Sequence, residues 1–297
     1  MMQLSCADFT FPLLERAKAL SLIRSLEFDH VDVGLFARSE HFSPAALAAS
    51  PRFYTAAVLA DLKAAELTAS DVFLQIGLEP EQCAANDPSL LQREENREAF
   101  ARAIEFCVAL QCRHLTGLPG VFHAGVAREQ DVEVAAQEAA RRMAVCADAG
   151  LQYAIEPHVG SICPDVAGTE QFLRLVPGLT LTLDYGHFVM AGESSKAVHA
   201  LLSHASHVHV RGGAIGQLQA SMKENQIDFA GMMEGLQRLG YSGFLAHEYV
   251  WIDWKGCNRN DNVSETILLR REIEAALGKD ERPGGAVADR RQGAVQS

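Results

Sequence analysis

The chain has 297 residues, of which 48% are hydrophobic and 22% charged, and its formal net charge is −12 at pH 7. This balance is typical of a globular protein with a sizeable core, and the length suits a single α/β barrel of about 250 residues. The negative charge argues against a broad nucleic-acid surface, and the sequence shows neither a secretory leader nor a long apolar segment. We therefore expect a cytoplasmic protein with no nucleic-acid or membrane partner.

Apolar runs typical of buried strands alternate with segments of helical periodicity along the chain. The predicted strands are residues 2–9, 28–35, 72–77, 114–120, 153–156, 179–184, 207–211 and 244–248. The predicted helices are residues 13–26, 55–65, 94–110, 130–149, 169–175, 195–202, 228–239 and 263–277. Because the alternation continues to the end, it favours a single (β/α)8 TIM barrel over an open sheet. No Gly-x-Gly-x-x-Gly follows a strand, which weakens the dinucleotide-binding alternative.

Two long connections interrupt this alternation. Residues 36–54, which contain Pro44 and Pro51, are expected to be irregular, and residues 79–92 are expected to form a loop long enough to cover something. We predict one barrel domain over residues 1–278. Residues 279–297 are too polar to offset the entropy of ordering and are predicted to be a flexible tail.

The seven cysteines include no Cys-x-x-Cys pair, and an odd number cannot all pair within the chain. Most of them, such as Cys107 and Cys146, lie in apolar helical patterns and are predicted to be small core residues in a reducing compartment. Cys163 follows a strand in a loop, but no histidine spacing indicates that it is activated as a nucleophile.

Polar side chains stand at the ends of the last four predicted strands. In a parallel barrel all strand ends open on one face, so these residues can converge although they are far apart in sequence. Three carboxylates and one imidazole favour Mn²⁺ or Mg²⁺ and tolerate Co²⁺ or Zn²⁺. The sequence therefore predicts one divalent-metal site, formed by Glu156, Asp184, His209 and Glu248.

The ordinary alternative for each of these residues is a solvated loop charge or a helix cap, and Asp184 could cap the segment that follows it. His207 and His247 precede proposed ligands, and strand alternation is expected to turn both to the other face, where they would pack or form hydrogen bonds. His158 follows the fifth strand, as either a hydrogen-bonded loop residue or a substrate ligand.

The chain resembles the sugar isomerase/epimerase superfamily of xylose-isomerase-like barrels, which includes ketose 3-epimerases, hydroxypyruvate isomerases, and inosose and dehydroshikimate dehydratases. The resemblance covers residues 1 to about 277 in element order. It is sharpest at Ile-Glu-Pro-His (155–158), Leu-Asp-Tyr-Gly-His (183–187), Val-His-Val-Arg (208–211), Ile-Asp-Phe (227–229) and the segment 240–248.

This resemblance implies that Glu156, Asp184, His209 and Glu248 are metal ligands and that Glu156 and Glu248 are also the acid/base pair. His187 matches the superfamily's substrate-binding histidine. The 3-epimerases carry an Arg six residues beyond the metal-binding His, where this chain has Ile215. Arg211 lies closer, and it is expected either to bind a substrate carboxylate or phosphate or to pair with Glu248 or Asp184.

The proposed chemistry starts when a divalent ion polarises an α-hydroxy carbonyl and stabilises an enediolate. One glutamate removes the carbon-bound proton, and the return of a proton gives epimerisation or isomerisation, whereas loss of a β-hydroxyl gives dehydration. His187, Arg211 and His158 are expected to bind the small-molecule substrate. Two pairs of aromatic residues are expected to wall the site, namely Trp251 with Trp254 and Phe9 with Phe36.

Three alternatives stand beside an isomerase or epimerase of a sugar, keto-sugar or hydroxy-keto acid. The first is a dehydratase of the inosose or dehydroshikimate type on the same barrel. The second is phosphodiester cleavage, which would need more strand-end histidines and a basic surface. The third is a binding module that has lost turnover. No segment of the sequence marks an interface, so homo-oligomer formation is left open.

Overall fold

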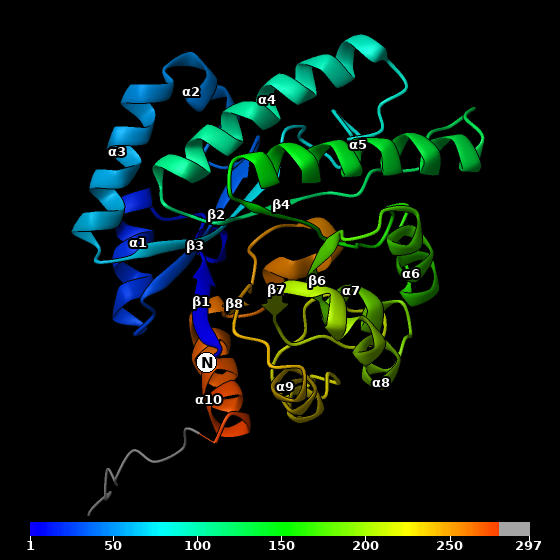
Figure 1. The fold of residues 1–297 in the computed structure, drawn as a ribbon. Coiled ribbons are helices and arrows are strands. Elements are labelled where there is room, and N and C mark those ends of the chain that lie inside the picture. The colour runs from blue at the N-terminus through cyan, green and yellow to red at the C-terminus, as the bar shows by residue number, and fades with distance from the viewer. Residues whose placement is uncertain (279–297) are drawn as a thin grey trace, which may run out of the picture.

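The computed structural model describes residues 1–278, and the predicted tail at 279–297 lies outside the described residues. Eight parallel strands close into a barrel in sequence order, with β1 paired to both β2 and β8 (Figure 1). The (β/α)8 fold class predicted from the alternation is confirmed. The strands are β1 Gln3–Ala7, β2 His30–Phe36, β3 Thr68–Gln75, β4 His114–Gly117, β5 Gln152–Ile155, β6 Thr180–Asp184, β7 Ala205–Val210 and β8 Phe244–His247.

Helices surround the strands on the outside of the barrel (Figure 1). The α-helices are α1 Arg16–Ser25, α2 Pro44–Ala49, α3 Pro51–Ala64, α4 Leu90–Ala109, α5 Arg128–Asp148, α6 Val166–Leu175, α7 Tyr185–Met190, α8 Ser195–Val198, α9 Phe229–Arg238 and α10 Asn262–Ala276. Short 3-10 helices cover Asp8–Thr10, His199–His204 and Trp254–Arg259. Within residues 1–278, no helix is both long and apolar enough to span a membrane.

The strands are buried on both faces, as parallel barrels require. On β2, Val31 and Val33 are fully buried in the main hydrophobic core. Asp32 lies between them, and it is also fully buried although it is charged. Because successive strand residues point to opposite faces, Asp32 is directed into the barrel interior. The interior therefore contains charged groups whose partners decide whether the barrel is stable.

The prediction that residues 36–54 are irregular is wrong, because helix α2 and the first turn of α3 lie there. Pro44 and Pro51 are the first residues of these two helices, a position where the missing N–H of proline costs nothing. The Ser43 side chain caps α2 by accepting a hydrogen bond from the Ala46 N–H. The prolines thus mark helix starts, although we interpreted them as marks of an irregular segment.

The predicted loop between β3 and α4 ends earlier than expected, because α4 begins at Leu90. Asn86 donates to the Val121 carbonyl at 2.7 Å, and Asn96 donates to the Ala84 carbonyl at 3.0 Å. These bonds hold the loop against the barrel. Glu79, near the start of the loop, lines the cavity at the barrel mouth, so the loop does cover part of that face.

Candidate active site

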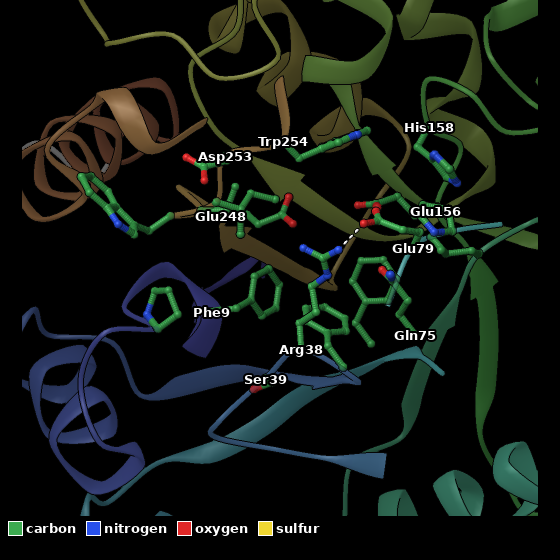
Figure 2. A pocket seen from close by; sticks show the side chains of 18 of the residues that line it. Phe9, Arg38, Ser39, Gln75, Glu79, Glu156, His158, Glu248, Asp253 and Trp254 are labelled. Atoms are coloured by element: carbon green, nitrogen blue, oxygen red, sulfur yellow. Dashed lines mark hydrogen bonds and ion pairs between the residues drawn. The ribbon is translucent and has the colours of Figure 1, made fainter. Parts of the chain in front are cut away.

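The four residues at the predicted strand ends lie at one face of the barrel. Glu156 directly follows β5, Asp184 ends β6, His209 lies in β7, and Glu248 directly follows β8. None of the four is more than 5% exposed. Figure 2 shows Glu156 and Glu248 with their carboxylates directed into the same cavity.

His209 stands between the two glutamates. Its Nδ1 lies 2.7 Å from Glu156 Oε1 and 3.2 Å from Glu248 Oε2. Ligand atoms of Glu156, His209 and Glu248 lie within 4.8 Å of one another, and so do those of Glu156, Asp184 and His187. The structure therefore brings the predicted residues together as two overlapping groups that share Glu156.

Arg211 separates Asp184 from Glu248. Its guanidinium is 3% exposed, pairs with Asp184 Oδ2, and lies 3.4 Å from Glu248 Oε2. The other oxygen of Asp184 accepts a hydrogen bond from the Gly186 N–H at 2.7 Å, which caps α7. Of the two roles considered for Arg211, the structure shows the ion pair with these acids.

Burial and the neighbouring charge of Glu248 raise the pKa of Glu156 to about 7. Burial alone would also raise the pKa of Glu248, but Arg211 and His209 outweigh burial and lower it. Burial raises the pKa of Asp184 in spite of the Arg211 charge beside it. Two carboxyl groups whose pKa values are pushed apart are suited to acid and base roles in one reaction.

The donor set fits a divalent cation. Glu248 Oε2 is buried and has ion-pair contacts with His209 and Arg211 but no well-formed hydrogen bond. Three carboxylates thus face one guanidinium and one imidazole. A dense group of buried carboxylates is stabilised by added positive charge, and oxygen-rich sets of this kind suit Mn²⁺ or Mg²⁺. The residues that would hold the ion are Glu156, Asp184, His209 and Glu248.

His187 and His158 both line the cavity. Burial and the Arg211 charge hold the pKa of His187 well below its usual range, so its imidazole is neutral. The Nδ1 of His158 lies 3.0 Å from the Val159 carbonyl and must donate to it, while its buried Nε2 has no partner. Burial also lowers the pKa of His158, so its Nε2 can accept a hydrogen bond from a ligand hydroxyl. The His187 nitrogens lie 3.5 Å from the Val159 N–H and 3.4 Å from Arg211, so a ligand would share them with these groups.

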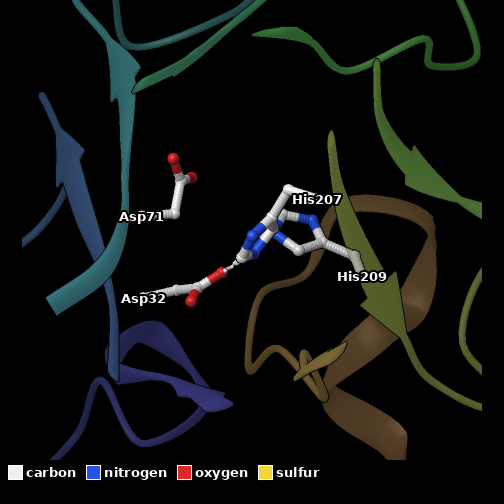
Figure 3. Close-up of side chains that lie close together, drawn as sticks. All are labelled: Asp32, Asp71, His207 and His209. Atoms are coloured by element: carbon white, nitrogen blue, oxygen red, sulfur yellow. Dashed lines mark hydrogen bonds and ion pairs between the residues drawn. The ribbon is translucent and has the colours of Figure 1, made fainter. Parts of the chain in front are cut away.

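A second polar group, which we did not predict, lies deeper in the barrel (Figure 3). Asp32 Oδ2 is 2.6 Å from His207 Nε2 and 3.3 Å from His209 Nε2. Asp32 Oδ1 accepts hydrogen bonds from Ser5 and Ser70. Burial by itself would raise the pKa of Asp32, but the two imidazoles outweigh burial and hold it well below its usual range.

The predicted orientation of His207 is wrong. His207 is two residues before His209, so strand alternation places both rings on the interior face. His247, which directly precedes Glu248, does turn to the other face, where its ring packs against Phe28 at 4.9 Å. Its Nδ1 lies 3.1 Å from the Ser5 carbonyl. Alternation counted in steps of two from His209 therefore places His207 in the barrel interior, where it pairs with Asp32.

The cavity at the barrel mouth has a volume of about 460 Å³. The five candidate residues Glu156, His158, His187, Arg211 and Glu248 form one part of its lining. The predicted aromatic wall is present, since Phe9, Phe36, Trp251 and Trp254 all line the same cavity. Burial raises the pKa of Cys163, which is consistent with an unreactive thiol.

The family model described as "Xylose isomerase-like TIM barrel" matches residues 20–273 of this chain. No curated protein matches the chain in sequence. The three solved structures described next are 12–15% identical to this chain, and this likeness shows the fold alone.

An L-ribulose 3-epimerase has a TM-score of 0.72 and 15% identity, with 99% of this chain and 100% of that chain covered. A D-psicose 3-epimerase, solved in the presence of D-fructose, has a TM-score of 0.73 and 12% identity, with 93% and 100% covered. The probable 3-DHS dehydratase AsbF from Bacillus anthracis has a TM-score of 0.66 and 13% identity, with 92% and 98% covered.

Replacing Asp32 with Asn should destabilise the barrel by about 3–5 kcal/mol, because the His207 and His209 imidazoles would lose the buried charge that compensates them. The folded-state pKa of Asp32 is lowered, so its contribution is present above the unfolded value of about 3.9 and is lost as the pH falls through the folded value. In urea unfolding, the free energy of unfolding of the unaltered protein should therefore exceed that of Asp32→Asn by the full amount near pH 6, and this difference should shrink below about pH 4.

Asp29→Asn is the matched control, since Asp29 pairs with Arg24 and its side chain is 69% exposed. This control should change the free energy of unfolding by about 1 kcal/mol or less. Equal effects of the two substitutions would contradict a special role for Asp32.

Proposed function

Because this chain belongs to the family of xylose isomerase-like TIM barrels, we propose that it is a divalent-metal-dependent isomerase or epimerase of a sugar, keto-sugar or hydroxy-keto acid. The observation that carries the proposal is the placement of Glu156 and Glu248 within 2.7 and 3.2 Å of one atom, His209 Nδ1, with pKa values pushed apart. Epimerases among the solved structures of the same fold support it.

Glu156, Asp184, His209 and Glu248 would hold the metal, with Mn²⁺ or Mg²⁺ favoured and Co²⁺ or Zn²⁺ tolerated. When bound, a divalent cation supplies Lewis-acid polarisation of the substrate carbonyl. Glu248, whose pKa is lowered, is the carboxylate at neutral pH and accepts the carbon-bound proton. Glu156, the second carboxyl group of the pair, would return a proton to the substrate.

The neutral His187 and His158 rings would orient substrate hydroxyl groups. The main role of Arg211 would be to hold the Asp184 and Glu248 carboxylates in place through its contacts with both. Such support matters because a displacement of about 1 Å at a reacting group can cost about 100-fold in rate.

The second candidate is a metal-dependent dehydratase of the inosose or dehydroshikimate type. A solved structure of a probable dehydratase with the same fold supports this candidate. Arg211 was the residue suggested for a substrate carboxylate, and its pairing with two acids of the protein weakens that argument. Loss of water from a dehydroshikimate-type substrate would produce a rise in ultraviolet absorbance, whereas epimerisation would not.

Two substitutions should separate metal binding from proton transfer. Asp184→Asn removes a proposed direct ligand of the metal. Loss of an outer-shell partner costs about 10–100-fold in metal affinity, and Asp184→Asn should cost more than that. Glu156→Gln should lower conversion of the substrate to product by about 100-fold or more even with metal bound, because the group that returns the proton is lost. Calorimetry measures the metal affinity, and NMR measures conversion and solvent-deuterium exchange over a panel of ketoses and hydroxy-keto acids.

Glu133→Gln, at an exposed position on α5, is the matched control and should change neither quantity. Absence of exchange with every panel substrate in the metal-loaded protein would refute the isomerase proposal. Normal conversion of substrate to product in Glu156→Gln would refute the role of Glu156.

Metal affinity should fall by at least about tenfold for each pH unit below 7. The pKa of Glu156 is raised to about 7 in the metal-free site, so below that pH the carboxyl must lose a proton before it can bind the ion. Binding at pH 7 should therefore release protons, which calorimetry detects as a heat that depends on the ionisation enthalpy of the buffer. Equal affinities at pH 6 and pH 8 would contradict the expectation.

A further inference from the structure

The barrel mouth carries a second hydrophobic cluster, separate from the main core. Phe9, Phe73 and Val250 are buried members of this cluster. Phe36, Leu118 and Trp254 are only partly buried and pack against it. All six side chains line the cavity that contains Glu156 and Glu248. A concave apolar surface beside a few converging polar groups is typical of a ligand site.

The aromatic rings form a continuous wall that leads to the catalytic candidates. The ring centroids of Phe9 and Phe36 are 4.9 Å apart, those of Phe36 and Phe73 are 5.1 Å apart, and those of Phe73 and His209 are 5.9 Å apart. Trp254 contacts His187 with centroids 6.1 Å apart. Figure 2 shows Phe9 and Trp254 on either side of the Glu156 and Glu248 carboxylates.

Gly34 makes this wall possible. A Cβ atom at residue 34 would lie 2.5 Å from Phe9 Cδ1 and 2.8 Å from Phe36 Cε2, closer than side-chain atoms can approach. The rings therefore fill the space that any other residue at this position would take. The packing of the two rings therefore depends on the glycine in the backbone of β2.

Polar side chains on the same side of the cavity are already engaged within the protein. Arg38 pairs with Glu79 and donates to the Leu78 carbonyl at 2.8 Å. The Ser39 hydroxyl accepts two backbone hydrogen bonds at 3.1 Å, and the Gln75 amide donates to the Gly77 carbonyl at 3.2 Å. A ligand with a hydroxyl on every carbon would have to compete for these groups or bury its hydroxyls against rings, which is unfavourable.

We propose that the substrate carries a planar apolar group, such as an aryl ring, beyond its hydroxy-carbonyl part. The ring would pack against the wall of Phe9, Phe36 and Phe73, opposite Trp254, while the hydroxy-carbonyl part faces Glu156 and Glu248. The cavity volume of about 460 Å³ leaves room for both parts. The inference rests on the proposed function only for the placement of the hydroxy-carbonyl part.

The test compares two ketones that differ in one group. Dihydroxyacetone and 1-hydroxy-3-phenylpropan-2-one share the unit HO–CH2–C=O, and the second has a phenyl group where the first has a hydroxyl. Both of the chain's tryptophans, Trp251 and Trp254, line the cavity, so their fluorescence reports directly on binding there. With Mg²⁺ present, the phenyl ketone should bind at least about tenfold more tightly, because burying the ring removes apolar surface from water.

Phe36→Ala should remove most of this advantage, because it should weaken binding of the phenyl ketone more than binding of dihydroxyacetone. Phe53→Ala is the matched control, because Phe53 is 81% exposed on α3 and does not line the cavity. Circular dichroism and thermal unfolding check that both variants fold. The comparison of the two ketones on the unaltered protein tests the inference even if Phe36→Ala does not fold.

Equal or tighter binding of dihydroxyacetone or D-fructose would overturn the inference, and so would an equal loss for both ketones in Phe36→Ala. Solvent-deuterium exchange, measured separately, tests the proposed function. Preferential phenyl ketone binding without exchange in any substrate would uphold the apolar subsite and refute the isomerase. Exchange in free sugars without preference for the phenyl ketone would do the opposite.

Discussion

The structure depends on the balance of charge inside the barrel. Asp32, Glu156, Asp184 and Glu248 are at most 5% exposed, and removing a carboxylate from water is costly unless a cation or hydrogen-bond donors compensate it. His209 contributes most to this balance, because its two nitrogens face Asp32 on one side and the two glutamates on the other. Arg211 supplies positive charge between Asp184 and Glu248, and His207 pairs with Asp32. The chain thus holds a strongly anionic group in place with His207 and His209 of β7 and with Arg211, which follows that strand.

This balance also explains why the site is suited to proton transfer. The compensating charges are distributed unequally. Arg211 lies beside Glu248 and Asp184, and in the described part of the chain it forms no ion pair with Glu156. Glu248 is therefore stabilised as the anion, while Glu156 keeps a pKa raised to about 7. Two chemically identical side chains acquire different protonation states from their surroundings. The side chains of the protein compensate the negative charge of these carboxylates only in part. A divalent cation among them would add further positive charge.

The sequence was enough to predict the closed barrel and the residues that converge at its mouth, because both follow from local features. Apolar runs mark strands, and in a parallel barrel the ends of all strands share a face. Asp32 was missed because one buried charge in an apolar strand carries no sign of its partners, His207 and His209, which lie more than 170 residues away. The contacts of Arg211 depend on side-chain direction, which sequence spacing does not determine. Helix α2 was missed because proline marks both loops and helix starts.

The mouth of the barrel is divided between two kinds of surface that come from different parts of the chain. The candidate metal ligands lie in or directly after β5 to β8, whereas the rings of Phe9, Phe36 and Phe73 come from the segments of β1 to β3. Each half obeys a separate constraint, charge compensation on one side and ring packing over Gly34 on the other. Under the proposed function, the chemistry would stay with the late strands while the rings of the early strands would determine which molecule fits against them. His209 contacts both Phe73 and the glutamates, so a ligand packed on the rings would lie next to the carboxylates.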